Sequence, residues 1–264
     1  MRPATLAKLD KHDPVAINAR AEEVVDYPVT FGGAVMAHYG HHITDGLSRL
    51  WHVDDNPCLL TSPLSGFSAR LASLGAKRVY MTPERPTLFR KVVVPSSSLL
   101  SDGVIYEAHD AEHKRIAEQA LKRSGFTPSW TVYLSRSRLG AERRIEGEDE
   151  IEAMLSHSGF EIIHPQDLSI EDQIAVFNRA DVVVGASGSA MHTSLFHIDK
   201  PLRIVTLCGP RFNRRFSLVD QIKSYRSTYI QCLEETSRDG RGVISSQRAD
   251  LDLVKNGLEM AGVI

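Results

Sequence analysis

The chain has 264 residues, of which 42% are hydrophobic and 24% are charged, and its formal net charge is −2. This composition is typical of a soluble globular protein and gives no sign of a dedicated nucleic-acid-binding protein. The longest apolar runs are far shorter than the roughly 20 residues that span a bilayer, and the first residues do not form a signal-peptide core. We therefore expect a cytoplasmic protein.

The first half of the chain alternates short apolar segments with helical patterns. We expect strands at residues 29–36, 57–61, 77–81 and 91–94, and helices at 42–51 and 67–74. A longer amphipathic segment, residues 108–124, ends at Gly125 with Lys122 and Arg123 in its last turn, as helix C-termini prefer. Because Pro128 follows, we predict a domain boundary within residues 125–129.

The second half alternates more regularly. We expect strands at residues 130–134, 160–163, 181–184 and 202–207, and helices at 147–157, 170–178 and 189–197. Ser169, with Asp172 three residues later, forms a capping box for one of these helices. The order predicts a parallel sheet covered on both faces, because each crossover helix packs back onto the sheet. We therefore predict two α/β domains, residues 1–126 and 127–264, that face each other across a cleft.

A glycine turn follows one of the predicted strands. Residues 185–196 read GASGSAMHTSLF and come directly after the apolar run 182–184. A strand that ends in a glycine turn and leads into a helix leaves backbone N–H groups free to hold an anion. Small residues here would equally allow close packing of helix on strand, so the local pattern leaves both interpretations open.

Arginines follow the strand predicted at 130–134. Arg136 stands at its end, and Arg143 and Arg144 lie in the loop beyond. The guanidinium group is always charged and binds phosphate oxygens in a bidentate manner, although a surface ion pair is the alternative for each residue. The acidic run 146–152 is explained by a solvated helix start that the helix dipole favours.

A second basic loop follows the strand predicted at 202–207. It contains Arg211, Arg214 and Arg215. A solvated loop, a ligand contact and contact with the inner face of an anionic membrane all remain open for this loop, and we assign it no role.

Several separate blocks of the chain follow one another in a specific order. They are YLSR at 133–136, RRIE at 143–146 with Glu148, GFEII at 159–163 followed by Gln173, and VVG at 183–185 with GSA at 188–190 and Phe196. These blocks resemble the pattern of glycosyltransferase family 61, the capsular-polysaccharide-type glycosyltransferases. The segment YGHHITD at 39–45 is similar to the family's Gly-His-x-x-x-Asp segment. Two positions depart from the pattern: Ser187 stands where the family often has histidine, and Thr193 where it often has asparagine.

The resemblance implies a GT-B-like fold of two Rossmann-like domains, of which the first is abbreviated because the chain is short for the family. It implies an inverting glycosyltransferase that moves a sugar from a nucleotide-diphosphosugar donor to a saccharide or glycan acceptor, as in bacterial surface-polysaccharide biosynthesis. The donor is expected on the second domain and the acceptor on the first. A non-catalytic glycan- or nucleotide-binding relative, or another nucleotide-using α/β enzyme such as a sugar-nucleotide epimerase, remains an alternative.

An inverting transfer needs a general base at the acceptor and positive charge at the departing diphosphate. Asp45 and His41 lie four residues apart, on one face of a helix predicted to begin near His42, so either could be the base or the two could form a pair. Helix capping and a packed histidine are the alternative. The candidate donor-binding residues are Arg136, Arg144, Gly185, Ser187, Gly188, Ser189, Ala190 and His192.

No metal or cofactor is expected. Asp54 and Asp55 are typical of a turn, and the aspartates at 250 and 252 are two residues apart at a helix start, where their side chains do not face each other. The three cysteines, Cys58, Cys208 and Cys232, are too widely spaced for a zinc site or a disulfide framework. The sequence leaves the donor sugar, the nucleobase, the acceptor and the oligomeric state open.

Overall fold

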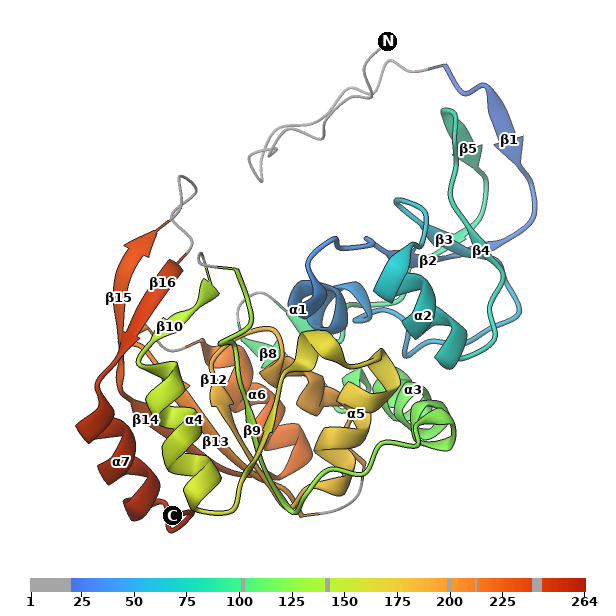
Figure 1. The fold of residues 1–264 in the computed structure, drawn as a ribbon. Coiled ribbons are helices and arrows are strands. Elements are labelled where there is room, and N and C mark those ends of the chain that lie inside the picture. The colour runs from blue at the N-terminus through green and yellow to red at the C-terminus, as the bar shows by residue number, and fades with distance from the viewer. Residues whose placement is uncertain (1–19, 101–102, 141–142, 199–200, 212, 239–243) are drawn as a thin grey trace.

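The computed structural model describes residues 20–264 apart from 101–102, 141–142, 199–200, 212 and 239–243. The chain has a mixed α/β architecture, as predicted, with a larger unit built on a five-stranded sheet and a smaller unit built on a four-stranded sheet (Figure 1). None of the helices in the described ranges is long and apolar enough to cross a membrane.

The larger sheet is parallel throughout and has the order β11-β9-β12-β13-β14. Its strands in chain order are β9 (Thr131–Leu134), β11 (Glu161–Ile163), β12 (Val182–Ala186), β13 (Arg203–Cys208) and β14 (Arg226–Gln231). After β11 the chain returns to the other side of β9, so the strand order reverses between β9 and β12. In doubly wound sheets this reversal is the place where ligands bind.

Helices cover this sheet on both faces because its strands are apolar on both sides. Along the strands, Tyr133, Val184 and Val205 pack with α4 (Glu148–His157) and α7 (Leu251–Met260). Their neighbours Val132 and Val183 pack instead with α5 (Ile170–Arg179) and α6 (Arg214–Lys223). The predicted strands and the helices α4 and α5 are therefore confirmed, with small shifts at their ends.

Two helix predictions are confirmed at their N-termini. The Ser169 hydroxyl accepts a hydrogen bond from the Asp172 N–H at 3.1 Å, which is the expected cap of α5. Asp250 caps α7 by accepting a hydrogen bond from the Leu253 N–H at 3.0 Å, so the aspartates at 250 and 252 mark a helix start, as predicted. The three cysteines are free and buried.

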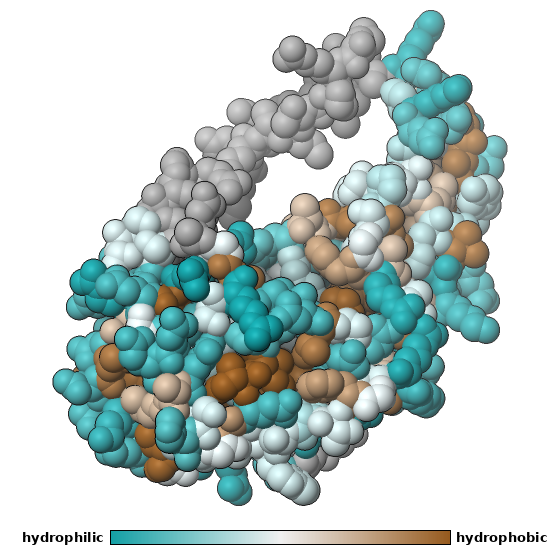
Figure 2. All heavy atoms as spheres, in the orientation of Figure 1, coloured by the Kyte–Doolittle hydropathy of each residue, from teal (hydrophilic) through white to brown (hydrophobic). Residues whose placement is uncertain are grey.

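The smaller unit repeats the parallel arrangement with the strand order β4-β3-β2-β6. Its strands are β2 (Val29–Gly33), β3 (Cys58–Leu60), β4 (Tyr80–Met81) and β6 (Val92–Val93), and α2 (Gly66–Leu74) follows β3. These strands lie within the four predicted segments but are shorter. Two elements that were not predicted, β1 (Glu23–Val25) and β5 (Thr87–Phe89), form an arm on which hydrophobic side chains are exposed (Figure 2).

The helix expected at 42–51 differs from the prediction. The helical segment starts earlier, as α1 (Tyr39–His41), and continues as a π-helical turn, η1 (His42–Gly46). The Leu47 N–H donates to the His42 carbonyl at 3.0 Å, which is the i to i+5 bond of a π-helix. Gly46 lies against the His42 ring, where an added Cβ would be 2.7 Å from Nδ1, so this close packing explains the wider turn.

The segment predicted as a helix at 189–197 is also different. It forms a short 3₁₀-helix, η4 (Met191–Phe196), preceded by i to i+3 bonds such as His192 N–H to the Ser189 carbonyl at 3.2 Å. A 3₁₀-helix rises farther per residue than an α-helix, so fewer residues are needed to connect β12 to β13.

The remaining elements were not predicted from the sequence. They are β7 (Leu99–Leu100), β8 (Val104–Ile105), β10 (Ile145–Glu146), η3 (Pro165–Asp167), β15 (Leu233–Arg238) and β16 (Ile244–Ala249), together with α6 and β14. The strands β10, β16 and β15 form a small sheet in that order beside the larger one.

The helix α3 (His109–Arg123) joins the two units. Its buried residues Ile116 and Ala120 share one hydrophobic core with Ile43 of the smaller unit and with Ile174 and Phe196 of the larger one. The predicted division after residue 126 lies shortly after α3 ends at Arg123, and it stays a prediction because the two halves are packed through this common core.

A buried ion pair fixes α3 to the smaller unit. Arg78 donates to Glu112 at 2.6 Å, and their side chains are only 4% and 1% exposed. Arg78 also donates to the Leu50 carbonyl, so one guanidinium connects α3 to the segment that follows η1.

We predict that Arg78→Met lowers the free energy of unfolding by about 3–5 kcal/mol, because it leaves the Glu112 carboxylate buried without its main partner. Urea denaturation measures this change. The matched control is Arg90→Met, which removes an exposed pair with Asp26 (61% and 76% exposed) and should cost less than about 1 kcal/mol. Equal losses in the two variants would contradict the prediction.

Candidate functional site

One large pocket, of about 700 Å³, lies between the two units at the carboxyl ends of β9 and β12. This is the strand reversal of the larger sheet. The smaller unit contributes side chains from α1 and η1, and the larger unit contributes the loops after β9, β12 and β13. Its charged and histidine side chains are His38, His41, Arg136, Arg143, Arg144, His192, Arg211 and Arg215.

The turn after β12 forms one wall of the pocket. The predicted donor-binding residues Ser187, Gly188, Ser189 and Ala190 all line it, and their contact with a donor stays a prediction. In the part of the chain that the structure describes, the N–H groups of residues 188–190 donate to no backbone carbonyl, whereas the Ser187 N–H donates to the Leu207 carbonyl at 2.8 Å. Three consecutive N–H groups are therefore available to an anion.

Arg136 lies directly against this turn. Its Nη2 atom donates to the carbonyls of Ser187 at 2.6 Å and Ala186 at 3.2 Å. A Cβ on Gly188 would be 2.0 Å from the same Nη2 atom, so a side chain at this position would force the guanidinium to shift. Arg136 thus shapes the turn as well as facing the pocket, and burial lowers the pKa of its guanidinium.

Gly185 does not line the pocket. It lies in β12, where an added Cβ would be 2.7 Å from Met191 Sδ and 3.3 Å from Leu134 Cβ. Its predicted donor contact therefore receives no support from its position. The absence of a side chain lets η4 pack closely on the sheet, which is the packing interpretation that the sequence left open.

His192 is buried in η4 and stacks on Phe216 of α6, with ring centroids 4.3 Å apart and planes 5° apart. Burial lowers the pKa of His192 to about 4, and the positive charge of Arg215 lowers it further in the same direction. The imidazole is thus neutral near pH 7. Its Nδ1 atom is buried and has no hydrogen-bond partner among the described residues.

Two glutamates support the loop after β9. Glu148 accepts hydrogen bonds from the Arg136 N–H at 2.8 Å and from the Tyr133 hydroxyl at 3.0 Å, and Glu152 accepts one from the Ser135 hydroxyl. Glu148 is only 2% exposed, and burial raises its pKa. The prediction that the acidic helix start is solvated is wrong for Glu148. Acidic residues are favoured at any helix N-terminus, so their presence there does not show whether a side chain is buried.

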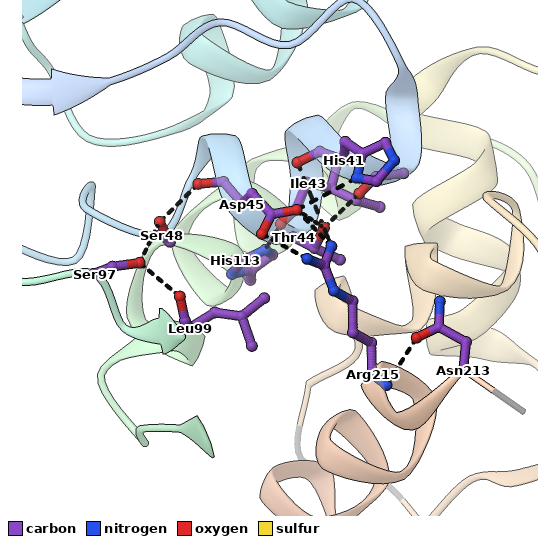
Figure 3. Close-up of polar contacts among 11 residues, drawn as sticks. His41, Ile43, Thr44, Asp45, Ser48, Ser97, Leu99, His113, Asn213 and Arg215 are labelled. Carbon is purple, nitrogen blue, oxygen red and sulfur yellow. Dashed lines mark hydrogen bonds and ion pairs between the residues drawn. The ribbon is translucent and has the colours of Figure 1, made fainter. Parts of the chain in front are cut away.

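On the opposite wall, His41 and Asp45 lie side by side, as predicted. His41 Nδ1 is 3.5 Å from Asp45 Oδ2, and the His41 side chain is 59% exposed. Arg215 reaches across from α6 and binds both carboxylate oxygens of Asp45 (Figure 3). Of these two residues, His41 lines the pocket and Asp45 does not.

A buried histidine of α3 supports the π-helical turn that carries Asp45. His113 of α3 places Nε2 2.7 Å from the Ile43 carbonyl and Nδ1 2.7 Å from the His109 carbonyl. Burial lowers the pKa of His113, while these two carbonyls raise it. These hydrogen bonds fix the position of η1 relative to α3 and therefore the position of His41 in the pocket wall.

The pocket is strongly positive. Five arginines line it, and no aspartate or glutamate does so within the described ranges. The side chains of Arg143 and Arg144 form no ion pair with any residue that the structure describes. Arg211 and Arg215 also face the pocket, so the loop to which the sequence assigned no role contributes to the site.

The comparisons with known proteins agree with this description. The family model described as Glycosyltransferase 61 matches residues 39–205, from α1 into β13. The match covers more than half of the chain, and the protein therefore belongs to glycosyltransferase family 61. A search of curated proteins returned no match. Arg211 and Arg215 lie beyond the matched residues, which explains why family motifs did not point to them.

The buried histidines predict a loss of stability in acid. Burial lowers the pKa of both His42 and His192 to about 4, whereas an unfolded histidine titrates near 6.5. Each stabilising contribution is thus complete above pH 6.5 and is lost as the pH falls toward 4, by up to about 3 kcal/mol per histidine. Urea denaturation at pH 7.5, 5.5 and 4.5 measures this loss.

The variant His192→Gln should lose less stability between pH 7.5 and 4.5 than the wild type. His157→Gln, which replaces an exposed histidine on α4, controls for the substitution itself. An identical pH dependence of the wild type and His192→Gln would show that His192 does not titrate as described.

Proposed function

We propose that this protein is an inverting glycosyltransferase that moves a sugar from a nucleotide-diphosphosugar donor to a saccharide or glycan acceptor. Membership in glycosyltransferase family 61 establishes the class, and the two-sided pocket supports the finer assignment. One wall carries a histidine beside a carboxylate, and the opposite wall carries arginines and free backbone N–H groups. An in-line transfer needs this pairing of a base with an anion-binding wall. A GT-B-like arrangement of the two units is part of the proposal.

The donor diphosphate is proposed to bind at the turn after β12. The N–H groups of residues 188–190 would bind phosphate oxygens, and Arg136 and Arg144 would neutralise their charge. We propose that this transfer is independent of metal ions and cofactors, because five arginines line the pocket and no described lining residue is a carboxylate that could bind a metal.

The acceptor is proposed to bind on the side of α1. His41 is the proposed base, because its ring is exposed to the pocket, whereas both oxygens of Asp45 already accept hydrogen bonds. In the reaction the acceptor oxygen bonds to the anomeric carbon, the bond to the phosphate oxygen breaks, and the hydroxyl proton passes to His41. Asp45 would orient the imidazole that receives it.

A binding-only relative is the second candidate. Ser187 replaces the histidine that the family often has in this turn, so one side-chain contact to the donor is lost. We place the catalytic protein in the cytoplasm, in bacterial surface-polysaccharide biosynthesis. Contact of the exposed Arg214 with the inner face of the membrane is a further part of the proposal.

The proposed function predicts binding and turnover of a nucleotide-diphosphosugar. A panel of nucleoside diphosphates in calorimetry, and of the corresponding nucleotide sugars in hydrolysis and transfer assays, tests it. Arg144→Gln and Arg136→Gln should each weaken binding of the diphosphate at least about 10-fold, the cost of a lost charge-assisted contact.

Arg138→Gln is the matched control for these arginines. Arg138 lies in the same loop but pairs with Asp167 at 2.9 Å and is not among the pocket residues. Its diphosphate affinity should equal that of the wild type. If no nucleotide of the panel binds or turns over, the protein is not a nucleotide-sugar transferase.

We predict that His41→Ala lowers kcat at least about 100-fold, because the acceptor proton loses its base, and changes nucleoside diphosphate affinity less than about 2-fold. The control is His52→Ala, because His52 also sits beside a carboxylate, Asp54 at 3.1 Å, but lies outside the pocket. Transfer that survives His41→Ala would place the base elsewhere.

A further inference from the structure

Arg215 forms a polar bridge across the pocket between the two units. From the first turn of α6 its Nη2 atom donates to Asp45 Oδ1 at 2.9 Å and its Nη1 atom to Asp45 Oδ2 at 2.5 Å (Figure 3). Nη1 also lies 3.2 Å from the Thr44 hydroxyl. The side chains of Arg215 and Asp45 are 29% and 27% exposed, so the pair is open to solvent and can be separated without unfolding.

The carboxylate of Asp45 is fully engaged in this arrangement. Besides the two bonds from Arg215, Oδ2 accepts a hydrogen bond from the Thr44 hydroxyl at 3.0 Å. His41 Nδ1 lies farther away, at 3.5 Å from the same oxygen. While Arg215 is bound, Asp45 can therefore orient His41 only weakly.

Arg215 also faces the pocket, where a bound anion would lie. It lines the pocket, and its charge acts on the buried His192, which follows the turn proposed to hold the diphosphate. The start of α6 is fixed by Asn213, whose side chain accepts a hydrogen bond from the Arg215 N–H at 3.0 Å. With the helix start held in this way, a rotation of the side chain would turn the guanidinium from Asp45 toward the pocket that it lines.

We propose that the donor diphosphate and Asp45 compete for Arg215. Donor binding draws the guanidinium away from Asp45, and the released carboxylate then pairs with His41 and prepares it to accept the acceptor proton. While Arg215 holds Asp45 the base is poorly oriented, and donor binding completes it. This coupling rests on the proposed function and adds Arg215 to it as a positioning residue that links donor occupancy to the base.

Competition has a consequence that a purely structural ion pair lacks. Because binding energies are coupled reciprocally, a donor that releases Asp45 from Arg215 must bind more tightly when Asp45 cannot hold Arg215. Asp45→Asn should therefore strengthen nucleoside diphosphate binding. A structural pair predicts the opposite or no change, since its loss would loosen the pocket.

A double-mutant cycle tests the proposal by calorimetry with UDP, GDP, CDP, ADP and dTDP, using the nucleotide that the wild type binds best. We expect Asp45→Asn to bind about 3- to 10-fold more tightly than the wild type, and Arg215→Gln about 10-fold more weakly. The double variant should bind like Arg215→Gln, within about 2-fold. The cycle separates competition from the general field effect of removing a negative charge, which would persist without Arg215.

Two further variants complete the test. Asp167→Asn removes an exposed carboxylate outside the pocket and should leave affinity unchanged. Arg215→Lys keeps the charge but loses the bidentate pair with Asp45. In the Arg215→Lys background, Asp45→Asn should therefore raise the affinity for the nucleoside diphosphate less than 2-fold. This comparison replaces the one with Arg215→Gln if that variant does not fold. An Asp45→Asn variant that binds no more tightly, or gains equally with and without Arg215, overturns the proposal. If no nucleotide binds the wild type, the proposed function fails together with it.

Discussion

The close packing of the turn α1–η1 against the 3₁₀-helix η4 is the constraint on which the site depends. Gly40 makes this approach possible, since a Cβ there would be 3.1 Å from Ser189 Oγ and 3.3 Å from a His192 ring carbon. The Tyr39 hydroxyl lies 3.1 Å from the Thr193 hydroxyl across the same contact. The two walls of the pocket are thus set by packed helical turns and by the shared core around α3, and this packing fixes the separation of His41 from the turn after β12.

The electrostatics of the pocket follow from where the carboxylates are placed. Five arginines face the pocket, and two of them have a carboxylate in the layer behind: Glu148 accepts a hydrogen bond from the backbone N–H of Arg136, and Asp45 pairs with the guanidinium of Arg215. This layer reduces repulsion among the arginines while the surface stays positive toward a ligand. The arginines that line the pocket without a carboxylate partner leave positive charge that an anion could balance, which supports the proposal that a diphosphate competes with Asp45 for Arg215.

Much of the larger unit could be predicted from sequence, because apolar runs bounded by turn residues identify parallel strands and caps such as Ser169 identify helix starts. The same pattern predicted that the candidate residues gather at the ends of β9 and β12, where the pocket lies. The π-helical turn could not be predicted, since it arises from the contact of Gly46 with the ring of His42 and leaves no periodic signal. Arg215 was missed for a related reason: its partner Asp45 is 170 positions away, and only the packing of α6 against η1 brings them together.

Serine at position 187, where the family often has histidine, changes the structure of the turn after β12 less than the sequence difference suggests. Two contacts of this residue use only its backbone: its N–H donates to the Leu207 carbonyl at 2.8 Å, and its carbonyl accepts from Arg136 at 2.6 Å. Any residue except proline, which lacks the N–H, could make them. The turn, the Arg136 guanidinium that packs on Gly188 and the free N–H groups after it are therefore independent of the side chain. Under the proposed function, serine in place of histidine would remove one side-chain contact to the donor and leave these backbone groups unchanged, so this position would affect donor binding without altering the turn.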